Sequence, residues 1–267
     1  MSAAYTWSHL IDDSTAEVFS TVLSPRRVQD FQDLQNEKAD SALDRRHRFV
    51  VASLYELPFF KNSSNHFART LLGGFSFAGT LTFESGEMAT VLDNGTDANL
   101  NGDSAGDRTI INVNGITGTS SSVVPLLKTC FAGFNPDGKT CKTPDDQRIV
   151  GYVAVNPNAQ YIQTGTGALS NSGRNTLRLP GINNLDFSIF KNFAIAGEGR
   201  VKFQLRADLY NAFNHPNFVP GSVDGVEPVA TTTQGAVNSV GANNFNNPSQ
   251  VFSSHSRVIQ IGGKFSF

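Results

Sequence analysis

The chain has 267 residues, of which 39% are hydrophobic and only 16% are charged, and its formal net charge is -2. This balance offers no basic face for nucleic acid, and no apolar run is long enough for a transmembrane helix. Phe (21 residues) and Gly (24) are both frequent, which favours strands and turns and therefore an all-β class. Residues 1–7 lack the basic and apolar regions of a secretory signal peptide.

Alternation of apolar and polar residues predicts about six strands along the chain. The clearest runs from Val201 to Tyr210, where one face is apolar and the other is polar. A soluble β-sandwich with one face in water could produce this pattern, and so could a membrane barrel with a polar lumen. The predicted strands lie near residues 3–11, 46–57, 70–83, 184–193, 200–213 and 257–267.

The connections between these strands alternate between long and short. Long segments cover residues 12–45, 84–182 and 214–255, whereas residues 58–69 and 194–199 form shorter links. Outer-membrane barrels have long extracellular loops and short periplasmic turns. Because a structureless segment as long as 84–182 is unusual in a compact soluble domain, we expect it to be a loop outside a membrane, without a packed core.

The last eight residues read as a barrel strand that ends on an aromatic residue. Gln260, Gly262, Phe265 and Phe267 follow the spacing polar-x-Gly-x-x-aromatic-x-aromatic. This spacing resembles the β-signal, the C-terminal pattern that the barrel-assembly machinery reads. That machinery is therefore an expected partner.

Several blocks of the sequence resemble Oar-like TonB-dependent outer-membrane transporters of the kind found in Acidobacteriota. The most specific block is Phe213-Asn214-His215-Pro216-Asn217-Phe218, which follows the strand with the polar face. The resemblance covers nearly the whole chain. Its blocks are residues 4–9 with 11–13, 44–50 with 55–59, 72–75, 184–193, 206–218 and the terminal strand.

The resemblance implies an antiparallel, up-and-down transmembrane β-barrel with long extracellular loops. Such transporters have roughly 22 strands around a plug, so about six strands correspond to the C-terminal part of the barrel. The plug and the N-terminal domain have no counterpart in the sequence. We therefore expect a fragment that does not transport a nutrient alone and that needs the remainder of the barrel and the plug as partners.

The same resemblance places the chain in the outer membrane of a Gram-negative bacterium, in contact with lipid and lipopolysaccharide. A soluble, secreted β-sandwich that acts as an adhesin or glycan-binding module is the alternative. An enzyme is not expected, because the five histidines are scattered and no catalytic spacing is present. No cofactor is expected either.

A possible calcium loop begins at Asp97. Oxygen-bearing side chains alternate up to a glycine at the turn, as in the first half of an EF-hand, but Arg108 stands where the bidentate Glu belongs. A solvated Asn/Gly loop is the alternative. The candidate ligands are Asp97, Asn99, Asn101 and Asp103, with Asp93 and Asp107 as additional candidates.

Cys130 and Cys141 are the only cysteines and are predicted to form a disulfide in an extracellular loop. Two free thiols are the alternative. The segment between them, residues 133–140, formally matches a phosphate-binding P-loop, but Pro125 and Pro144 exclude the strand and helix which that motif requires.

Arg45, Arg46 and Arg48 form the basic cluster of the sequence. Paired charges at a barrel rim are one interpretation. Contact with lipopolysaccharide phosphates is the other, because Arg binds phosphate through two parallel hydrogen bonds.

Overall fold

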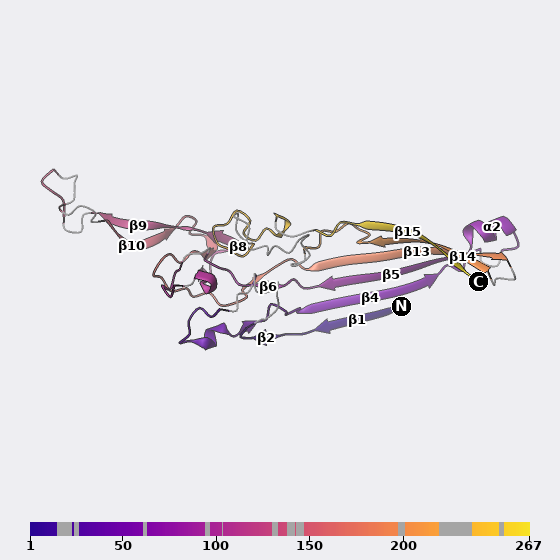
Figure 1. Cartoon of the computed structure of the whole chain (residues 1–267), viewed down its shortest axis with the longest axis horizontal. Coiled ribbons are helices and arrows are strands. Elements are labelled where there is room, and N and C mark those ends of the chain that lie inside the picture. Colours follow the sequence, from indigo (N-terminus) through magenta and orange to yellow (C-terminus); the bar gives the residue numbers. More distant parts are fainter. Residues whose placement is uncertain are drawn as a thin grey trace.

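The structure is a computed structural model that describes residues 1–14, 23, 27–60, 63–93, 97–102, 104–129, 133–137, 142, 147–196, 201–218, 237–250 and 254–267. Within these residues, one long antiparallel sheet carries a lobe of shorter strands and turns at one end (Figure 1). No helix of the described residues is long and apolar enough to cross a membrane.

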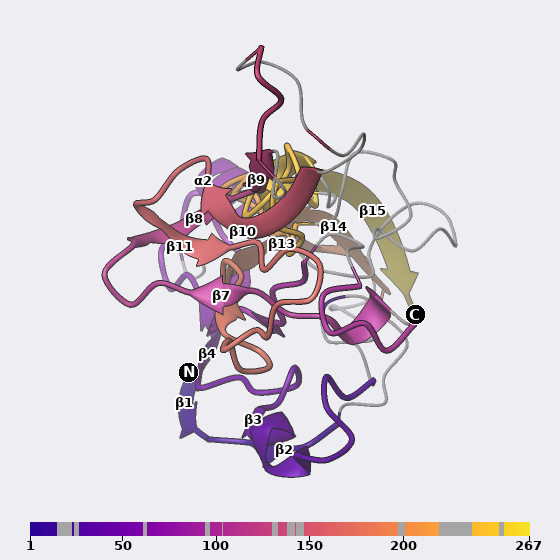
Figure 2. The same ribbon diagram turned by 90° about the vertical axis from the view of Figure 1, so that its left-hand side faces the viewer.

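The long sheet has six strands in the order β1-β4-β5-β13-β14-β15, and all neighbours are antiparallel. Seen along the strands, it is curved (Figure 2). Strands β1 and β15 are its edges, so the described residues form no closed barrel, and nothing supports the expected total of roughly 22 strands. The strands are β1 (Ser2–Trp7), β4 (His47–Glu56), β5 (Phe75–Glu84), β13 (Ile182–Ala196), β14 (Val201–Tyr210) and β15 (Val258–Ser266).

The strand register separates the two faces of this sheet by chemistry. Side chains alternate between the faces along each strand, and the antiparallel pairing aligns like with like across the sheet. The apolar face includes Phe49, Val51, Phe77, Leu81, Leu185, Phe187, Ile189, Leu205, Leu209 and Ile261. The opposite face is mostly polar and includes Thr80, Thr82, Asp186, Ser188, Gln204, Arg206, Asp208, Gln260 and Lys264.

Phenylalanine rings link neighbouring strands on the apolar face. The Phe77 and Phe187 rings stack with centroids 5.7 Å apart, and those of Phe203 and Phe265 are 4.7 Å apart. Such cross-strand aromatic pairs stabilise one register over a slipped one. Strands β4, β5 and β14 have ten residues each and β15 has nine, which is close to the roughly 9–11 residues that a tilted membrane strand needs.

The apolar face is not the inside of a sandwich. Leu205 is 45% exposed and Ile261 is 74% exposed, so no second sheet of the described residues covers them. A soluble β-sandwich would bury this face against another sheet about 10 Å away. The sandwich alternative therefore does not fit the described part of the chain.

The strand predicted at residues 70–83 begins later than expected. Residues His66–Leu72 form the helix α2, whose N-terminus is capped by the Asn65 side chain, an acceptor for the amides of Phe67 (3.0 Å) and Ala68 (3.3 Å). Gly74 then adopts a positive φ of 76°, which ends the helical turn and lets β5 start at Phe75.

Two other predicted strands differ at one end. The strand expected at residues 3–11 ends at Trp7, and Ile11–Asp12 forms the separate short strand β2. The strand expected at residues 200–213 ends at Tyr210, because Asn211 has a positive φ of 49°. The turn expected at residues 194–199 starts later, since β13 continues to Ala196, and residues 197–200 lie outside the described ones.

The three long connections, residues 8–46, 85–181 and 211–257, lie at one end of the sheet, and we call their described part the loop lobe (Figures 1 and 2). Its 3₁₀ helices are η1 (Leu34–Glu37), η2 (Ser104–Gly106) and η5 (Pro248–Gln250). Its strands are β2 (Ile11–Asp12), β3 (Ala39–Asp40), β6 (Met88–Ala89), β7 (Ile110–Ile111), β8 (Ile116–Ser121), β9 (Val123–Thr129), β10 (Gln147–Ala154), β11 (Ala159–Ile162) and β12 (Leu177–Arg178).

The expectation of an unpacked loop at residues 84–182 is therefore wrong. Apolar residues from all three connections meet in one buried cluster: Leu23 from the first, Val91 and Tyr161 from the second, and Val237 and Val240 from the third. Each connection has too few apolar residues to form a core alone. Together they exclude water from a shared one.

A lysine on either face of β5 should separate the roles of the two faces. Leu81 lies opposite Val51 and Leu185 on the apolar face, and its neighbour Thr80 lies opposite Asp186 on the polar face. If the apolar face contacts lipid, Leu81→Lys should destabilise the membrane-inserted protein by about 2–4 kcal/mol, the cost of a lysine at the bilayer midplane.

Urea titration of the vesicle-inserted protein measures this difference. Thr80→Lys is the matched control and should cost much less. Equal destabilisation by the two lysines would contradict the assignment of the faces.

Candidate functional site

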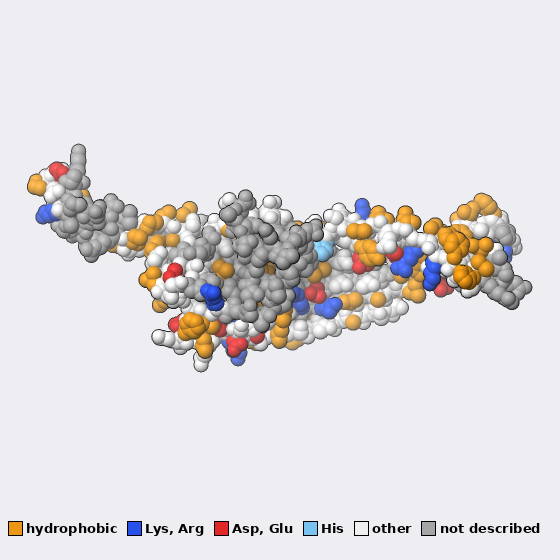
Figure 3. Space-filling model, viewed as in Figure 1, with side chains coloured by type: hydrophobic (Ala, Val, Ile, Leu, Met, Phe, Trp, Pro, Cys, Tyr) orange, Lys and Arg blue, Asp and Glu red, His pale blue; other side chains and the backbone are white. Residues whose placement is uncertain are grey.

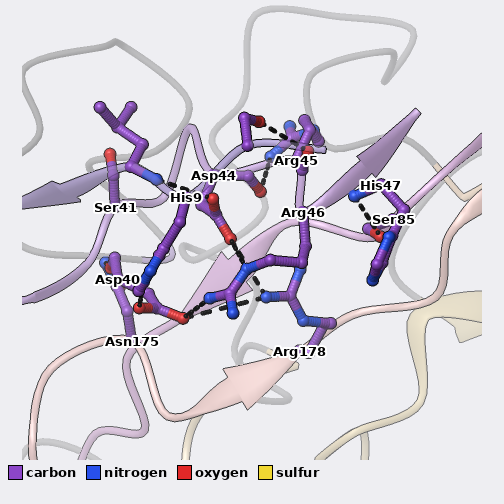
Figure 4. Close-up of polar contacts among 12 residues, drawn as sticks. His9, Asp40, Ser41, Asp44, Arg45, Arg46, His47, Ser85, Asn175 and Arg178 are labelled. Atoms are coloured by element: carbon purple, nitrogen blue, oxygen red, sulfur yellow. Dashed lines mark hydrogen bonds and ion pairs between the residues drawn. The ribbon is translucent and has the colours of Figure 1, made fainter. Parts of the chain in front are cut away.

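A network of charged side chains joins the base of the loop lobe to the end of the sheet. Asp40 accepts hydrogen bonds from His9 Nε2 and from Arg46 Nη2, both at 2.7 Å. Asp44 lies between Arg46 Nε at 3.4 Å and Arg178 Nη2 at 3.3 Å. Figure 4 shows these groups pointing toward one another from segments far apart in the sequence.

Asp44 is the buried centre of this network, with a fully buried side chain. Burial tends to raise the pKa of its carboxyl group. The hydrogen bond from Leu10 N (3.0 Å) and the Arg178 and Arg46 guanidinium groups outweigh burial, and the pKa is lowered below its usual value. The carboxylate therefore stays charged at neutral pH and holds two arginines in place.

The three arginines of the predicted basic cluster are each paired with carboxylates. Arg45 reaches Glu84 Oε1 and Glu87 Oε2, both at 3.1 Å, and Arg46 reaches Asp40 and Asp44. Arg48 is the most exposed, and its Nε lies 3.3 Å from Glu84 Oε2. This arrangement favours paired rim charges over a free phosphate-binding cluster.

Two further ion pairs cross the loop lobe at depth. The Arg108 guanidinium contacts the Glu37 carboxylate, and both side chains are almost fully buried. Arg174 contacts the Asp12 carboxylate and also donates from Nε to the Glu37 carbonyl at 3.0 Å. A buried charge is costly unless it is paired, so these contacts fix the first long connection against the second.

The predicted calcium loop forms one wall of a polar cleft. Asp97 accepts hydrogen bonds from the amides of Asn101 (3.1 Å) and Gly102 (2.9 Å), and Asn99 donates to the Gln29 carbonyl (2.9 Å). Asn99 and Asn101 line a cleft of about 560 Å³. Other lining residues are Asp30, Asn36, Arg108 and Asn171.

Asp103 lies outside the described residues. The described residues contain no group of three or more His, Cys, Asp or Glu side chains that could hold a metal ion. The described carboxylate and amide oxygens of this loop shape its backbone, and calcium binding stays a prediction.

The additional candidates Asp93 and Asp107 are buried beside each other. Asp93 N donates to the Asp107 carbonyl at 3.0 Å, and Asp107 Oδ2 accepts from Ala98 N at 2.6 Å. Burial raises the pKa of Asp93 to about 6. The hydrogen bonds from Thr164 oppose this shift and the charge of Asp107 adds to it.

The Phe-Asn-His-Pro-Asn block has a structural role at the lobe end of the last hairpin. The Asn211 amide Nδ2 donates to the carbonyls of His215 (2.8 Å) and His255 (2.7 Å), and Asn211 N donates to Asp186 at 2.9 Å. Asn217 accepts from Asn183 N at 2.8 Å. These bonds tie the ends of β13 and β14 to the segment that leads into β15.

The remaining predicted site residues lie apart from this network. Cys130 and Cys141 lie outside the described residues, so the disulfide stays a prediction. Gln260 and Gly262 lie on the polar face of β15 opposite Asp208 and Arg206, whereas Phe265 lies on the apolar face. Phe267 follows the strand and is fully exposed.

Sequence analysis did not identify Glu37, Arg174 or Arg178 as members of a charged network. No short motif connects them, because their partners are far away in the chain. Arg174 and Asp12 are 162 positions apart, and Arg178 and Asp44 are 134 apart. A usable signal was the number of charged residues within connections predicted to be irregular.

The raised pKa of Asp93 predicts a pH-dependent loop lobe. A folded-state pKa raised from 3.8 to about 6 gives stability that is full below pH 4 and is lost as the pH rises through 6. Asp93→Asn should remove this dependence and stabilise the lobe at pH 7.5 by up to about 3 kcal/mol. Hydrogen exchange at Leu92 N, bonded to the Asn238 carbonyl, reports it.

Asp30→Asn changes an exposed carboxyl group in the same lobe and is the control. It should leave the exchange rate at Leu92 unchanged. An exchange rate in the Asp93→Asn protein that varies between pH 4 and 6 as in the parent would refute the assignment to Asp93.

Comparison with known proteins gives one family. The model of the outer membrane beta barrel domain matches residues 1–260. No curated protein and no solved structure matches the chain. Proteins of this family are typically non-enzymatic, and their location is the bacterial outer membrane. The matched region covers almost the whole chain and includes the six long strands with their three connections, so the chain belongs to the outer membrane beta barrel domain family.

Proposed function

We propose that the chain forms part of the barrel wall and the extracellular loops of a TonB-dependent transporter of the Oar-like type, which takes up a nutrient across the outer membrane. The chain alone would not be competent for transport. It would act together with a plug and with the remainder of the barrel.

The last hairpin carries this proposal. The block at residues 206–218 is the most specific part of the resemblance, and its asparagines make the hydrogen bonds that hold the lobe end of β13, β14 and β15 together. A transporter that binds its substrate from outside needs loops held rigidly on the barrel rim. The shared core and ion pairs of the loop lobe support such a role.

The two edges of the sheet support a larger assembly. Strands β1 and β15 each have one neighbour in the described residues. Unpaired backbone groups at a sheet edge are costly in lipid, where no water can satisfy them. We propose that strands from the remainder of the barrel pair with both edges.

The proposed partners follow from the location of each surface. The terminal pattern Gln260, Gly262, Phe265 and Phe267 would bind the barrel-assembly machinery, and the apolar face would contact lipid. Lipopolysaccharide would surround the lobe end of the sheet. Arg48, the most exposed of the three clustered arginines, is the candidate for contact with its phosphates.

The genomic sequence upstream of Met1, read in frame through any stop or frameshift, tests the transporter proposal most directly. We expect it to encode a plug, a TonB-contacting segment and a signal peptide. An unrelated gene in that position would contradict the proposal.

Replacement of the last aromatic residue tests the assembly signal. In the complete polypeptide, Phe267→Asp should prevent barrel assembly, because a charge replaces the aromatic group that the β-signal requires. Phe267→Tyr retains the ring and should assemble. Heat-modifiable migration of the outer-membrane fraction on electrophoresis measures assembly, and normal assembly of the Asp variant would exclude Phe267 as part of the signal.

A further inference from the structure

The apolar face of the sheet carries one lysine, at the end opposite the loop lobe. Lys191 lies opposite Phe75 on β5 and Leu205 on β14, both of which face the apolar side. Its side chain is nevertheless buried, with a residue exposure of 5%. A charged group on a lipid-facing surface requires a partner that satisfies it.

Helix α2 supplies that partner. The Lys191 ammonium Nζ donates to the carbonyls of Leu71 and Gly73, each at 2.7 Å, at the C-terminal end of the helix. The rings of Phe75 and Phe193 lie 4.2 Å and 5.1 Å from the same nitrogen. Cations favour the C-terminal carbonyls of a helix and the faces of aromatic rings, so these contacts hold α2 against the apolar face.

The sheet continues past the level of α2. Strand β5 starts at Phe75, but β13 and β14 pair further along, where Phe193 lies opposite Phe203 and stacks on it at 6.1 Å. Phe265 on β15 adds a third ring to this row. Apolar side chains therefore face outward beyond the position where α2 is attached, which puts the helix beside the apolar band.

The segment around α2 exposes its own large apolar side chains. Phe67 is 73% exposed, and Phe59, Phe60, Leu71 and Leu72 are each about half exposed or more. Figure 3 shows hydrophobic side chains gathered at this end of the molecule, where Figure 1 places α2. In water such a patch would be unfavourable, whereas at a membrane interface it continues the lipid-facing surface.

We propose that residues 57–74, with α2 at their centre, lie in the headgroup region of the inner, phospholipid leaflet and anchor this rim of the barrel in it. Lys191 fixes the segment to the sheet. The short connection between β4 and β5 is then a lipid-binding element and not merely a turn in the periplasm. The proposal rests on the membrane-facing sheet and is independent of what the protein transports.

Tryptophan fluorescence quenching by brominated phosphatidylcholine tests the location of α2. Trp7, the only tryptophan, lies on the apolar face of β1 and serves as the reference in the parent. In a Trp7→Phe background, Phe67→Trp in the vesicle-bound full chain, isolated by flotation, should be quenched as strongly as Trp7. Quenching should be strongest for bromine atoms close to the headgroup.

Leu100→Trp in the same background is the matched control, because Leu100 is also exposed but lies in the loop lobe. It should not be quenched. Quenching of Trp7 without quenching at position 67 would overturn the α2 proposal alone. Absence of quenching at both positions would overturn the membrane placement of the sheet and the α2 proposal with it.

Lys191→Met tests what holds the helix. This variant keeps the length of the side chain but cannot bond to the Leu71 and Gly73 carbonyls. In the Trp7→Phe, Phe67→Trp protein it should reduce quenching at position 67, while quenching of Trp7 in the otherwise unchanged chain persists. Undiminished quenching at position 67 would show that Lys191 does not fix the segment.

Discussion

Backbone hydrogen bonding between antiparallel strands is the constraint on which the rest of the structure depends. Hydrocarbon offers no water to satisfy an amide or a carbonyl, so a chain that crosses it must pair these groups internally. The central strand, β13, does so with β5 on one side and β14 on the other. Once this register is set, each side chain is assigned to one face, and the separation into an apolar and a polar face follows.

The loop lobe is built by a different principle. Its apolar core is small, and buried ion pairs between distant segments connect its three parts. Each of these charges would be costly if its partner moved away. The resulting lobe is held in one arrangement on the rim of the sheet, which suits a surface that presents loops to the exterior.

The charged residues of the chain are therefore arranged according to where they lie. Those on the polar face of the sheet remain partly exposed, those in the loop lobe are paired and buried, and Lys191 on the apolar face is enclosed by α2 and two rings. The Asp93 and Asp44 carboxyl groups show how local contacts decide the outcome within one lobe. Burial dominates at Asp93 and raises its pKa, whereas guanidinium and amide donors outweigh burial at Asp44 and lower it.

The amino-acid sequence by itself determined the long strands, because alternation from Val201 to Tyr210 or from Phe75 to Phe83 depends only on neighbouring residues. Tertiary structure decided the rest. Helix α2 interrupts an alternating stretch, since Asn65 caps it and Lys191 from another strand holds its end. The lobe core joins Leu23, Tyr161 and Val237. No local pattern links residues so far apart, because they meet only when the sheet brings the three connections to one end.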